Sequence, residues 1–297
     1  VHTSSFIQKY NQVRNFFREF SNELTPILSQ DLKNFITDLP SYESTTEQNL
    51  SEKEIEEKLV SSGFKRKLKW FQLRNVKFLN NLNCGANFSV PGAGKTTDAL
   101  AFYFLKKNTG KEKLLIISPI NAYLSWKDDI KACVTNPSEI IKIRGSVEQV
   151  NEILLQEGEF FWTNYQTLQN ENKLDNLISF IIRNDNITVI LDESHRGKGP
   201  DISSRLIKLA PFPKNKLILT GTPMPQEAAD LRSQFSFLFP KNNILSDEDF
   251  VDAFQPFYIR RTDGDLGLKP LDIKYIKVKP YQAHEEFYET YVRQGLI

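Results

Sequence analysis

A stretch of nine residues combines the side chains and the backbone freedom that phosphate binding needs. It runs Ser89-Val-Pro-Gly-Ala-Gly-Lys-Thr-Thr97. Gly92 and Gly94 have no side chain and accept a positive φ, so consecutive backbone N–H groups can close around an anion. Lys95 adds a cation for the phosphate oxygens, and the helix expected to begin here points its positive end at the same anion. The stretch therefore predicts a nucleotide-binding loop made of Gly92, Ala93, Gly94, Lys95, Thr96 and Thr97, with the Thr96 hydroxyl available to Mg²⁺.

An acidic pair further along the chain supplies the complementary chemistry. The apolar run 187–191 leads directly into Asp192 and Glu193. At the end of a buried strand we expect Asp192 to hold Mg²⁺ through water, and Glu193 to orient and deprotonate the water that attacks ATP. His195 would link the γ-phosphate to a coupling turn made of Thr220, Gly221 and Thr222, although a plain turn explains that composition equally well.

One glutamine upstream of the loop has the chemistry to recognise adenine. A helix over 68–79 would bury Leu68, Phe71, Val76 and Leu79 and leave Gln72 free. The amide of Gln72 donates and accepts at once, which suits the adenine edge. In isolation it is an ordinary surface glutamine, but its place ahead of a phosphate loop favours a role in ATP binding.

The elements that must position these residues alternate along the chain. Short apolar runs at 114–119, 140–143, 160–163, 187–191 and 216–220 are typical of strands buried on both faces, and helical stretches such as 146–156 and 174–182 separate most of them. Active residues are expected at the carboxyl ends of the strands. The predicted fold class is α/β, a phosphate-loop lobe with a mostly parallel sheet between helices.

Residues 1–62 read as a helical accessory region in front of this lobe, which would occupy 63–297. Apolar side chains recur at helical spacing between residues 6 and 38, and 40–50 are polar and read as a linker. Ser51 with Glu54 predicts a capping box for a further helix that ends near Gly63. The apolar stripe is typical of a core or of a surface for protein partners, and we assign it no chemistry.

Composition limits the classes of protein that fit. The 297 residues are 40% apolar and 25% charged, which predicts a packed core, and a net charge of +1 offers no global attraction to nucleic acid. Cys84 and Cys133 are far apart and outside any metal-type pair, which suggests a reducing compartment. Apolar runs stay short of the roughly 20 residues that span a bilayer. We expect no membrane partner and a soluble cytoplasmic protein, nucleoid-associated in a bacterium and nuclear in a eukaryote. Because the sequence begins at Val1, we also expect a fragment or a processed form.

The order of the motifs resembles that of the Swi/Snf-type branch of superfamily-two helicases and translocases, with a bacterial defence-system member as one form. The segments that carry the resemblance are 68–79, 92–97, 119–126 with its tryptophan, 163–168, 192–198, 220–223 with 235–240, and 257–262 with its arginine pair. Ser194 stands where these enzymes usually carry alanine, and Pro225 where they usually carry glutamine. Residues 1–62 match no pattern of the family.

The resemblance implies the first RecA-like lobe of an ATP-dependent motor on double-stranded DNA, with ATP and Mg²⁺ as cofactors. Such motors need a second RecA-like lobe that carries an arginine finger, and we do not expect that lobe within these residues. Arg260 and Arg261 would lie at the interface between the lobes. The DNA phosphate backbone would meet Asn121, Thr163, Tyr165 and Lys198, which predicts binding that is independent of sequence and sensitive to salt.

Two other functions remain open at this point. One is a strand-separating helicase of a restriction or anti-phage defence system. The other is a nucleotide-gated binding module that switches a partner without turnover. ATP hydrolysis with and without duplex DNA separates the module from the motors.

Overall fold

The computed structural model describes residues 50–184, 186–198, 200–223, 229–240, 254–262, 264–267, 281 and 284. Contacts divide the chain into two units, Val1–Thr262 and Asp263–Ile297, and the sheet with its helices belongs to the first. The helices expected between residues 6 and 38 lie outside the described residues. In the described ranges, no helix is long and apolar enough to cross a membrane.

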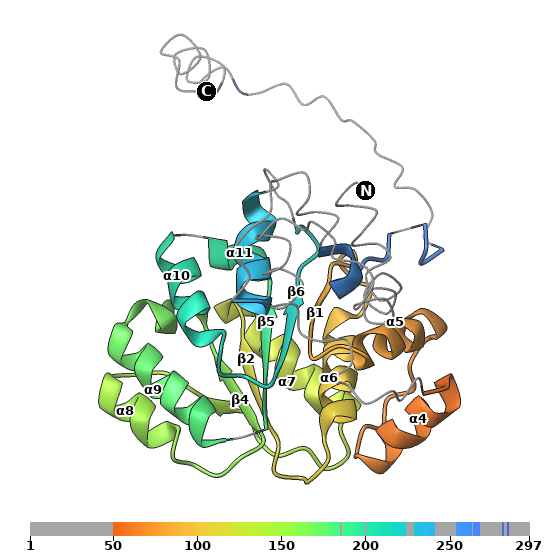
Figure 1. Cartoon of the computed structure of the whole chain (residues 1–297), viewed down its shortest axis with the longest axis horizontal. Coiled ribbons are helices and arrows are strands. Elements are labelled where there is room, and N and C mark those ends of the chain that lie inside the picture. Colours follow the sequence, from red (N-terminus) through yellow and green to blue (C-terminus); the bar gives the residue numbers. More distant parts are fainter. Residues whose placement is uncertain are drawn as a thin grey trace, which may run out of the picture. The chain divides into compact units, whose positions relative to one another are not determined.

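Seven strands form one sheet in the described part of the first unit (Figure 1). They are β1 (Cys84–Asn87), β2 (Lys113–Ile117), β3 (Ile141–Lys142), β4 (Phe160–Thr163), β5 (Ile187–Asp192), β6 (Asn215–Leu219) and β7 (Tyr258–Ile259). The order is β3-β4-β2-β5-β6-β1-β7, and every pair of neighbours is parallel. The predicted α/β fold with a mostly parallel sheet is confirmed.

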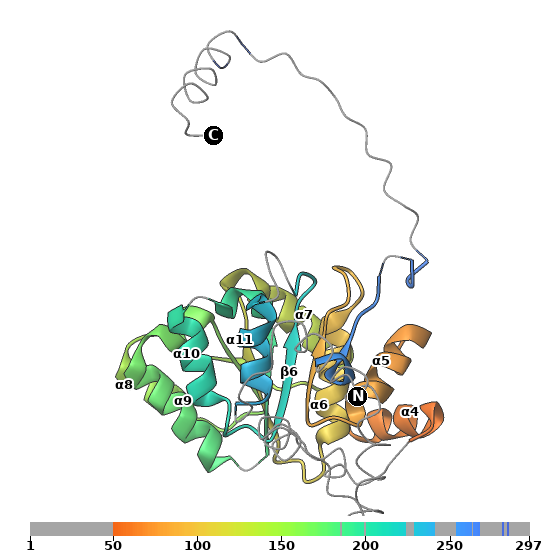
Figure 2. The ribbon, with the colours of Figure 1, turned by 45° about the horizontal axis from the view of Figure 1, so that its top comes forward.

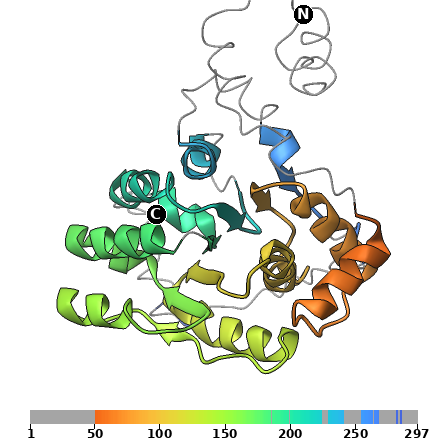
Figure 3. The same ribbon diagram turned by 60° about the horizontal axis from the view of Figure 1, so that its bottom comes forward.

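Helices cover both faces of this sheet. One group contains α4 (Glu52–Ser61), α5 (Trp70–Asn80), α6 (Lys95–Lys106) and α7 (Tyr123–Cys133), and the other contains α8 (Val147–Ile153), α9 (Glu171–Arg183), α10 (Pro200–Leu209) and α11 (Ala229–Leu238). Figure 2 shows the separation of α4 to α6 from α8 to α10, and Figure 3 shows the strands between the two groups. The connections that the structure describes also contain the short 3-10 helices η2 (Ile120–Ala122), η3 (Tyr165–Gln169), η4 (Ser194–Lys198) and η5 (Gln255–Phe257).

The central strands are apolar on both sides because both sides are covered. Residues 114–117 of β2 are fully buried, and the apolar residues of β5 are at most 1% exposed. Alternating polar residues would leave unpaired groups under the helices, so a continuous apolar run is the pattern that a doubly covered parallel strand needs. The large side chains Trp126 and Trp162 fill the same core.

The helix before the lobe begins and ends as the sequence predicts. Ser51 and Glu54 form the capping box of α4, and Gly63 follows the helix with a φ of 100°. Ile55 and Leu59 are buried in the same hydrophobic core as the sheet, and α4 contacts both α5 and α6. Helix α4, which ends the predicted accessory region, thus packs on the lobe itself. The division of the chain at residue 62 stays a prediction.

The carboxyl edge of the sheet gathers the residues singled out by the sequence. β1 leads into the phosphate loop, β5 ends at Asp192, and β6 leads into Thr220. Because β6 pairs with both β1 and β5, the loop and the acidic pair lie on either side of it. Parallel strands end at the same edge, and ligand sites of such sheets form there.

Candidate active site at the carboxyl edge of the sheet

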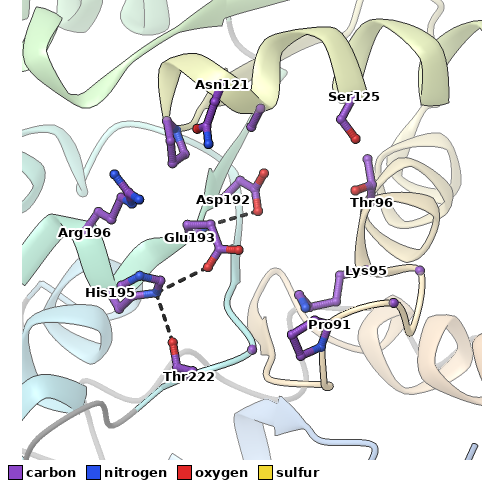
Figure 4. A pocket seen from close by; sticks show the side chains of 15 residues that line it. Pro91, Lys95, Thr96, Asn121, Ser125, Asp192, Glu193, His195, Arg196 and Thr222 are labelled. Carbon is purple, nitrogen blue, oxygen red and sulfur yellow. Dashed lines mark hydrogen bonds and ion pairs between the residues drawn. The ribbon is translucent and has the colours of Figure 1, made fainter. Parts of the chain in front are cut away.

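A cavity of about 640 Å³ opens at this edge. Its lining comes from the phosphate loop, the η2–α7 segment, the end of β5 and the turn after β6; the residues are Pro91, Gly92, Gly94, Lys95, Thr96, Pro119, Asn121, Ala122, Ser125, Asp192, Glu193, His195, Arg196, Gly221 and Thr222. Figure 4 shows Lys95 and Thr96 on one side, with Asp192, Glu193 and His195 across from them. The structure thus brings together residues nearly a hundred positions apart, as predicted.

The phosphate loop has the backbone that its glycines allow. Gly92 and Gly94 take φ values of 81° and 80°, and α6 begins at Lys95 directly after Gly94. The Lys95 ammonium donates to the carbonyl oxygens of Ser89 at 2.9 Å and Val90 at 3.3 Å. Burial lowers the pKa of Lys95, and the nearby carboxylates act in the opposite direction. A partly desolvated cation of this kind favours an incoming anion.

Two of the predicted loop residues do not line the cavity. Thr97 is 4% exposed, and its hydroxyl accepts a hydrogen bond from Arg66 at 2.9 Å. Thr96 and Thr97 are neighbours on α6, so their side chains point to different sides of the helix, and it is Thr96 that lines the cavity. Ala93 is also buried, with its N–H donating to the Val90 carbonyl. The Thr97 side chain therefore holds Arg66 rather than the cavity, and the predicted contact of Thr97 with the nucleotide stays a prediction.

Both oxygens of the Asp192 carboxylate are held by donors. The indole N–H of Trp126 donates to Oδ2 at 2.8 Å, and the backbone N–H of Glu193 donates to Oδ1 at 3.0 Å. Burial raises the pKa of Asp192, the Trp126 hydrogen bond lowers it, and the Glu193 charge raises it again. A buried carboxylate beside a second carboxylate is a place where a cation is stabilising.

Glu193 stands in a backbone conformation that is uncommon for its type. Its φ is 51°, in the left-handed region that costs a residue with a side chain of order 1 kcal/mol or more. The turn places its Oε2 3.3 Å from Nδ1 of His195, and both residues line the cavity. The strained backbone lies directly after the end of β5, where it lets the Glu193 carboxylate face the phosphate loop.

His195 joins the acidic pair to the turn after β6. Its Nδ1 lies 2.9 Å from Oγ1 of Thr220 and 3.4 Å from Oγ1 of Thr222. Gly221 packs against the phosphate loop so closely that a Cβ there would lie 2.9 Å from Cδ of Pro91. The predicted coupling residues thus contact both halves of the cavity lining.

Gln72 is not free, contrary to the expectation from the sequence. It is 6% exposed, its Oε1 accepts from the Lys69 N–H at 3.1 Å, and its Nε2 donates to the Gly94 carbonyl at 3.4 Å. The helix turns Gln72 and Asn75 inward together with Val76, because α5 packs its inner face on α6. Gln72 therefore touches the phosphate loop itself.

The predicted DNA-contacting residues fall into different environments. Thr163 is fully buried and donates to the Ile143 carbonyl, while Tyr165 is 3% exposed and donates to the Asp192 carbonyl at 2.9 Å. Neither side chain is presented to a partner, so these two assignments are corrected. Asn121 is exposed and lines the cavity. The side chain of Lys198 lies outside what the structure describes.

The two arginines near the end of the first unit point to different surroundings. Arg260 is exposed, as an interface residue should be. The side chain of Arg261 turns inward, and its Nε donates to Oδ1 of Asn75 at 2.9 Å. Arg261 thus makes a contact within this lobe, and its predicted role at a lobe interface stays a prediction.

Several residues of the site were missed from the sequence. Arg196 and Ser125 line the cavity, and Trp126 holds Asp192. Arg196 directly follows His195, so its position beside the acidic pair was a usable signal. The Trp126 contact spans 66 positions of sequence, and no local pattern announces it.

Comparison with known proteins finds a matching family model and several related helicases. The family model described as the SNF2-related domain matches residues 70–266. An uncharacterized ATP-dependent helicase of Mycoplasma pneumoniae is 29% identical, over 92% of this chain and 28% of its own length. Human chromodomain-helicase-DNA-binding protein 1 is 25% identical, over 67% of this chain and 13% of its own. The chain spans less than a third of the length of these curated relatives.

Solved structures share the fold. The SWI2/SNF2 ATPase core of Sulfolobus solfataricus in complex with dsDNA matches with a TM-score of 0.55 and 19% identity, over 69% of this chain and 47% of that one. The SWI2/SNF2 ATPase core domain of the same organism matches with a TM-score of 0.55 and 18% identity, over 76% of this chain and 48% of that one. At this identity the likeness concerns the arrangement of strands and helices.

Proposed function

The chain belongs to the SNF2-related family, and from that membership we propose that it is the ATP-binding lobe of an ATP-dependent translocase on double-stranded DNA. The observation that carries the proposal is that Lys95 and Thr96 on one side, and Asp192 and Glu193 on the other, line the same cavity. A cation, a hydroxyl and two carboxylates around one cavity are the groups that phosphoryl transfer to water requires.

Each group has a separate task. Lys95 and the N–H groups of the loop from Gly92 to Gly94 bind the phosphates of ATP, at the N-terminus of α6. Glu193 accepts the proton of the attacking water. His195, which contacts Glu193, Thr220 and Thr222, reports the state of the phosphate to the turn after β6. Gln72 meets the adenine edge once its long contact with Gly94 is exchanged for the base.

The residues around Asp192 fit a magnesium ion. Thr96 and Asp192 offer oxygen atoms to the same cavity, and in the described ranges no three side chains from His, Cys, Asp and Glu are arranged so that together they could hold a metal ion. Mg²⁺ characteristically takes one or two protein oxygens and completes its shell with water and substrate phosphates. When bound, it neutralises charge on the phosphate oxygens. Trp126 keeps the Asp192 carboxylate aimed at this position.

Replacing Trp126 with phenylalanine should weaken the response to Mg²⁺. The change removes the N–H donor to Oδ2 of Asp192 and keeps an aromatic ring, and loss of such an outer contact lowers metal affinity by roughly tenfold or more. ATP binding titrated against Mg²⁺ measures the shift. Trp70→Phe is the matched control because Trp70 is 59% exposed and lies outside the cavity lining. An unchanged Mg²⁺ midpoint in a folded Trp126→Phe protein would remove the positioning role.

Duplex DNA is the proposed track. The Sulfolobus core was solved with dsDNA, and Asn121 at the rim of the cavity is exposed. Contact with the phosphate backbone gives stimulation that is independent of base sequence and falls with salt. Because DNA is the proposed substrate, the same proposal places the protein where DNA is found, with the nucleoid in a bacterial cytoplasm or in a eukaryotic nucleus.

A second RecA-like lobe completes the motor in this proposal. The chain matches 47% of the Sulfolobus ATPase core, which leaves room for a lobe of similar size. That lobe supplies the arginine finger, a group that contributes about 10³ to 10⁵ in rate. Arg260, exposed at the end of the first unit, faces the interface. Protein partners, in the same proposal, bind through residues 1–62.

The test separates binding from turnover. The 297-residue chain should bind ATP with Mg²⁺, and a protein that carries both lobes should hydrolyse ATP faster with duplex DNA of any sequence. Absence of ATP binding by the folded chain would overturn the proposed site. Binding with no turnover in the two-lobe protein would favour a nucleotide-gated module, and separation of strands in a forked duplex would favour a helicase.

A further inference from the structure

The phosphate loop is paired with a segment about 170 residues away in sequence. β7 pairs with β1, with Tyr258 opposite Ala86 and Ile259 opposite Asn87. The hydrogen bonds continue beyond both strands, because the Phe88 N–H donates to the Ile259 carbonyl at 2.8 Å. The segment 258–262, called here the exit segment, therefore runs alongside the chain that enters the loop.

Two further contacts extend this pairing into the loop itself. The Val90 N–H donates to the Arg261 carbonyl at 3.0 Å, and the Arg261 N–H donates to the Ser89 hydroxyl at 3.1 Å. Ser89 and Val90 are also the residues whose carbonyl oxygens hold the Lys95 ammonium. The same two residues thus meet Lys95 through their carbonyls and Arg261 through their other polar groups.

The side chain of Arg261 closes a polar ring behind the loop. Its Nε donates to Oδ1 of Asn75 at 2.9 Å, and Nδ2 of Asn75 donates to Oδ2 of Asp98 at 2.9 Å. Nδ2 of Asn87 donates to the same oxygen at 3.0 Å, and Oδ1 of Asn87 accepts from the Ser89 N–H at 3.1 Å. The polar ring, made of Asn75, Asn87, Ser89, Asp98 and Arg261, joins α5, β1, the loop, α6 and the exit segment.

Burial makes this ring sensitive to the loss of a member. Asn75, Asn87, Ser89 and Asp98 are each 0% exposed. Burial raises the pKa of Asp98 to about 8, while the amides of Asn75, Asn87 and Gln72 and the Arg261 charge lower it. Oδ1 of Asp98 has no hydrogen-bond partner among the described residues. A buried polar network is stabilising only when its members are satisfied, so Arg261 has a direct part in holding the others.

Binding of a phosphate would change the contacts that Ser89 and Val90 make through their carbonyl oxygens, which hold Lys95. A phosphate is a stronger acceptor for the Lys95 ammonium than two backbone carbonyls are. When Lys95 turns to the phosphate, Ser89 and Val90 lose that donor and keep their contacts with Arg261. The position of the loop in the bound form then depends on the exit segment.

We propose that Arg261 is a positioning residue for the phosphate loop, and that it couples occupancy of the loop by a nucleoside triphosphate to the placement of the exit segment. The coupling rests on the proposed ATP site and extends it. The first unit ends at Thr262, one residue beyond Arg261, so the coupled segment is the one by which the chain leaves the lobe. Coupling of this kind is reciprocal: holding the exit segment strengthens nucleotide binding.

The first experiment compares Arg261→Ala with Arg260→Ala in the 297-residue chain. Arg260 is the matched control because it is adjacent, equally charged and exposed. Titration with MgATP should show affinity lowered by roughly 2- to 30-fold for Arg261→Ala, and affinity within twofold of wild type for Arg260→Ala. Equal affinities for both folded variants and the wild type would overturn the coupling.

Hydrogen exchange supplies a readout that a merely structural role would not move. In the wild type, MgATP should change the protection of the Val90 and Arg261 amides, and this change should be lost in Arg261→Ala. The same nucleotide-induced change in both proteins would also overturn the proposal. Where Arg261→Ala fails to fold, Ser89→Ala removes only the acceptor of the Arg261 N–H and should lower the affinity in the same direction. Unchanged affinity of folded Ser89→Ala would count against the coupling.

The failure of this inference is distinguishable from failure of the ATP site. A wild-type chain that does not bind MgATP refutes the proposed function. A wild-type chain that binds, together with Arg261→Ala and Ser89→Ala variants that bind equally well, refutes the coupling alone.

Discussion

Replacing Glu193 with glutamine should leave ATP bound and nearly stop its hydrolysis. The amide can still donate to or accept from a water molecule, but it cannot take a proton from it. Removal of a general base lowers the rate by about 10² to 10⁴. The geometry supports a specific effect, since Glu193 lines the cavity opposite Lys95 and its Oε2 is 3.3 Å from His195. Steady-state ATP turnover with saturating duplex DNA, in a protein with both lobes, measures the loss.

The matched control for this change is Glu157→Gln. Glu157 lies in a second cavity at the opposite edge of the sheet, and its side chain is fully exposed beside Lys113. ATP turnover should stay at the wild-type level in this variant. Turnover within threefold of wild type in Glu193→Gln, with ATP affinity intact, would mean that another residue is the base.

Replacing Lys95 with alanine should remove most of the affinity for ATP. Hydrogen bonds to charged groups contribute about 1.5 to 3 kcal/mol, which corresponds to a loss of roughly ten- to hundredfold. The fold should persist, because within the described residues the Lys95 ammonium donates hydrogen bonds only to the carbonyls of Ser89 and Val90. Water can replace the ammonium at both carbonyls. Isothermal titration of the 297-residue chain with MgATP measures the affinity.

A control lysine shows whether the loss is local. Lys131 is exposed on α7, and Lys131→Ala removes the same charge from the chain without touching the cavity. Its affinity for ATP should match the wild type. Wild-type affinity in folded Lys95→Ala would contradict the assignment of the phosphate loop.

The strands of the sheet, the phosphate loop and the acidic pair could be predicted because short stretches of sequence indicate each of them. Five apolar runs predicted five strands, and each lies within two residues of the observed bounds. Gly92, Gly94 and Lys95 are informative together, since few other sites need that combination. Once the strands are taken as parallel, their carboxyl ends must meet at one edge, and Asp192 then has to face the loop.

The errors arose where a polar residue takes part in packing. Gln72 is a polar position on the inner face of α5, so a pattern that scores only apolar side chains assigns it to solvent. Thr163 and Tyr165 lie in a motif that is near the cavity, but the motif does not say whether a side chain points to a partner or to the core. Both point inward, at 0% and 3% exposure.

Long-range polar contacts were beyond the sequence for a different reason. Arg261 and Asn75 are 186 positions apart, and neither residue type nor spacing links them. Ser194, noted only as a departure from the usual alanine, donates to Oε1 of the buried Gln234 at 2.6 Å, and Gln234 donates to the Pro223 carbonyl. Such pairs become visible only when the three-dimensional arrangement is known.

The placement of β1 between β6 and β7 also sets the order in which this protein can assemble. During synthesis, residues 84–87 emerge long before their partners at 215–219 and 258–259, so β1 must wait with both edges unpaired. Pairing across such separations is slow, because a long loop has to close before the contacts form. The phosphate loop gains its last support only when Arg261 has left the ribosome. A nascent chain that stops short of that residue carries every glycine and lysine of the loop and still lacks its completed form.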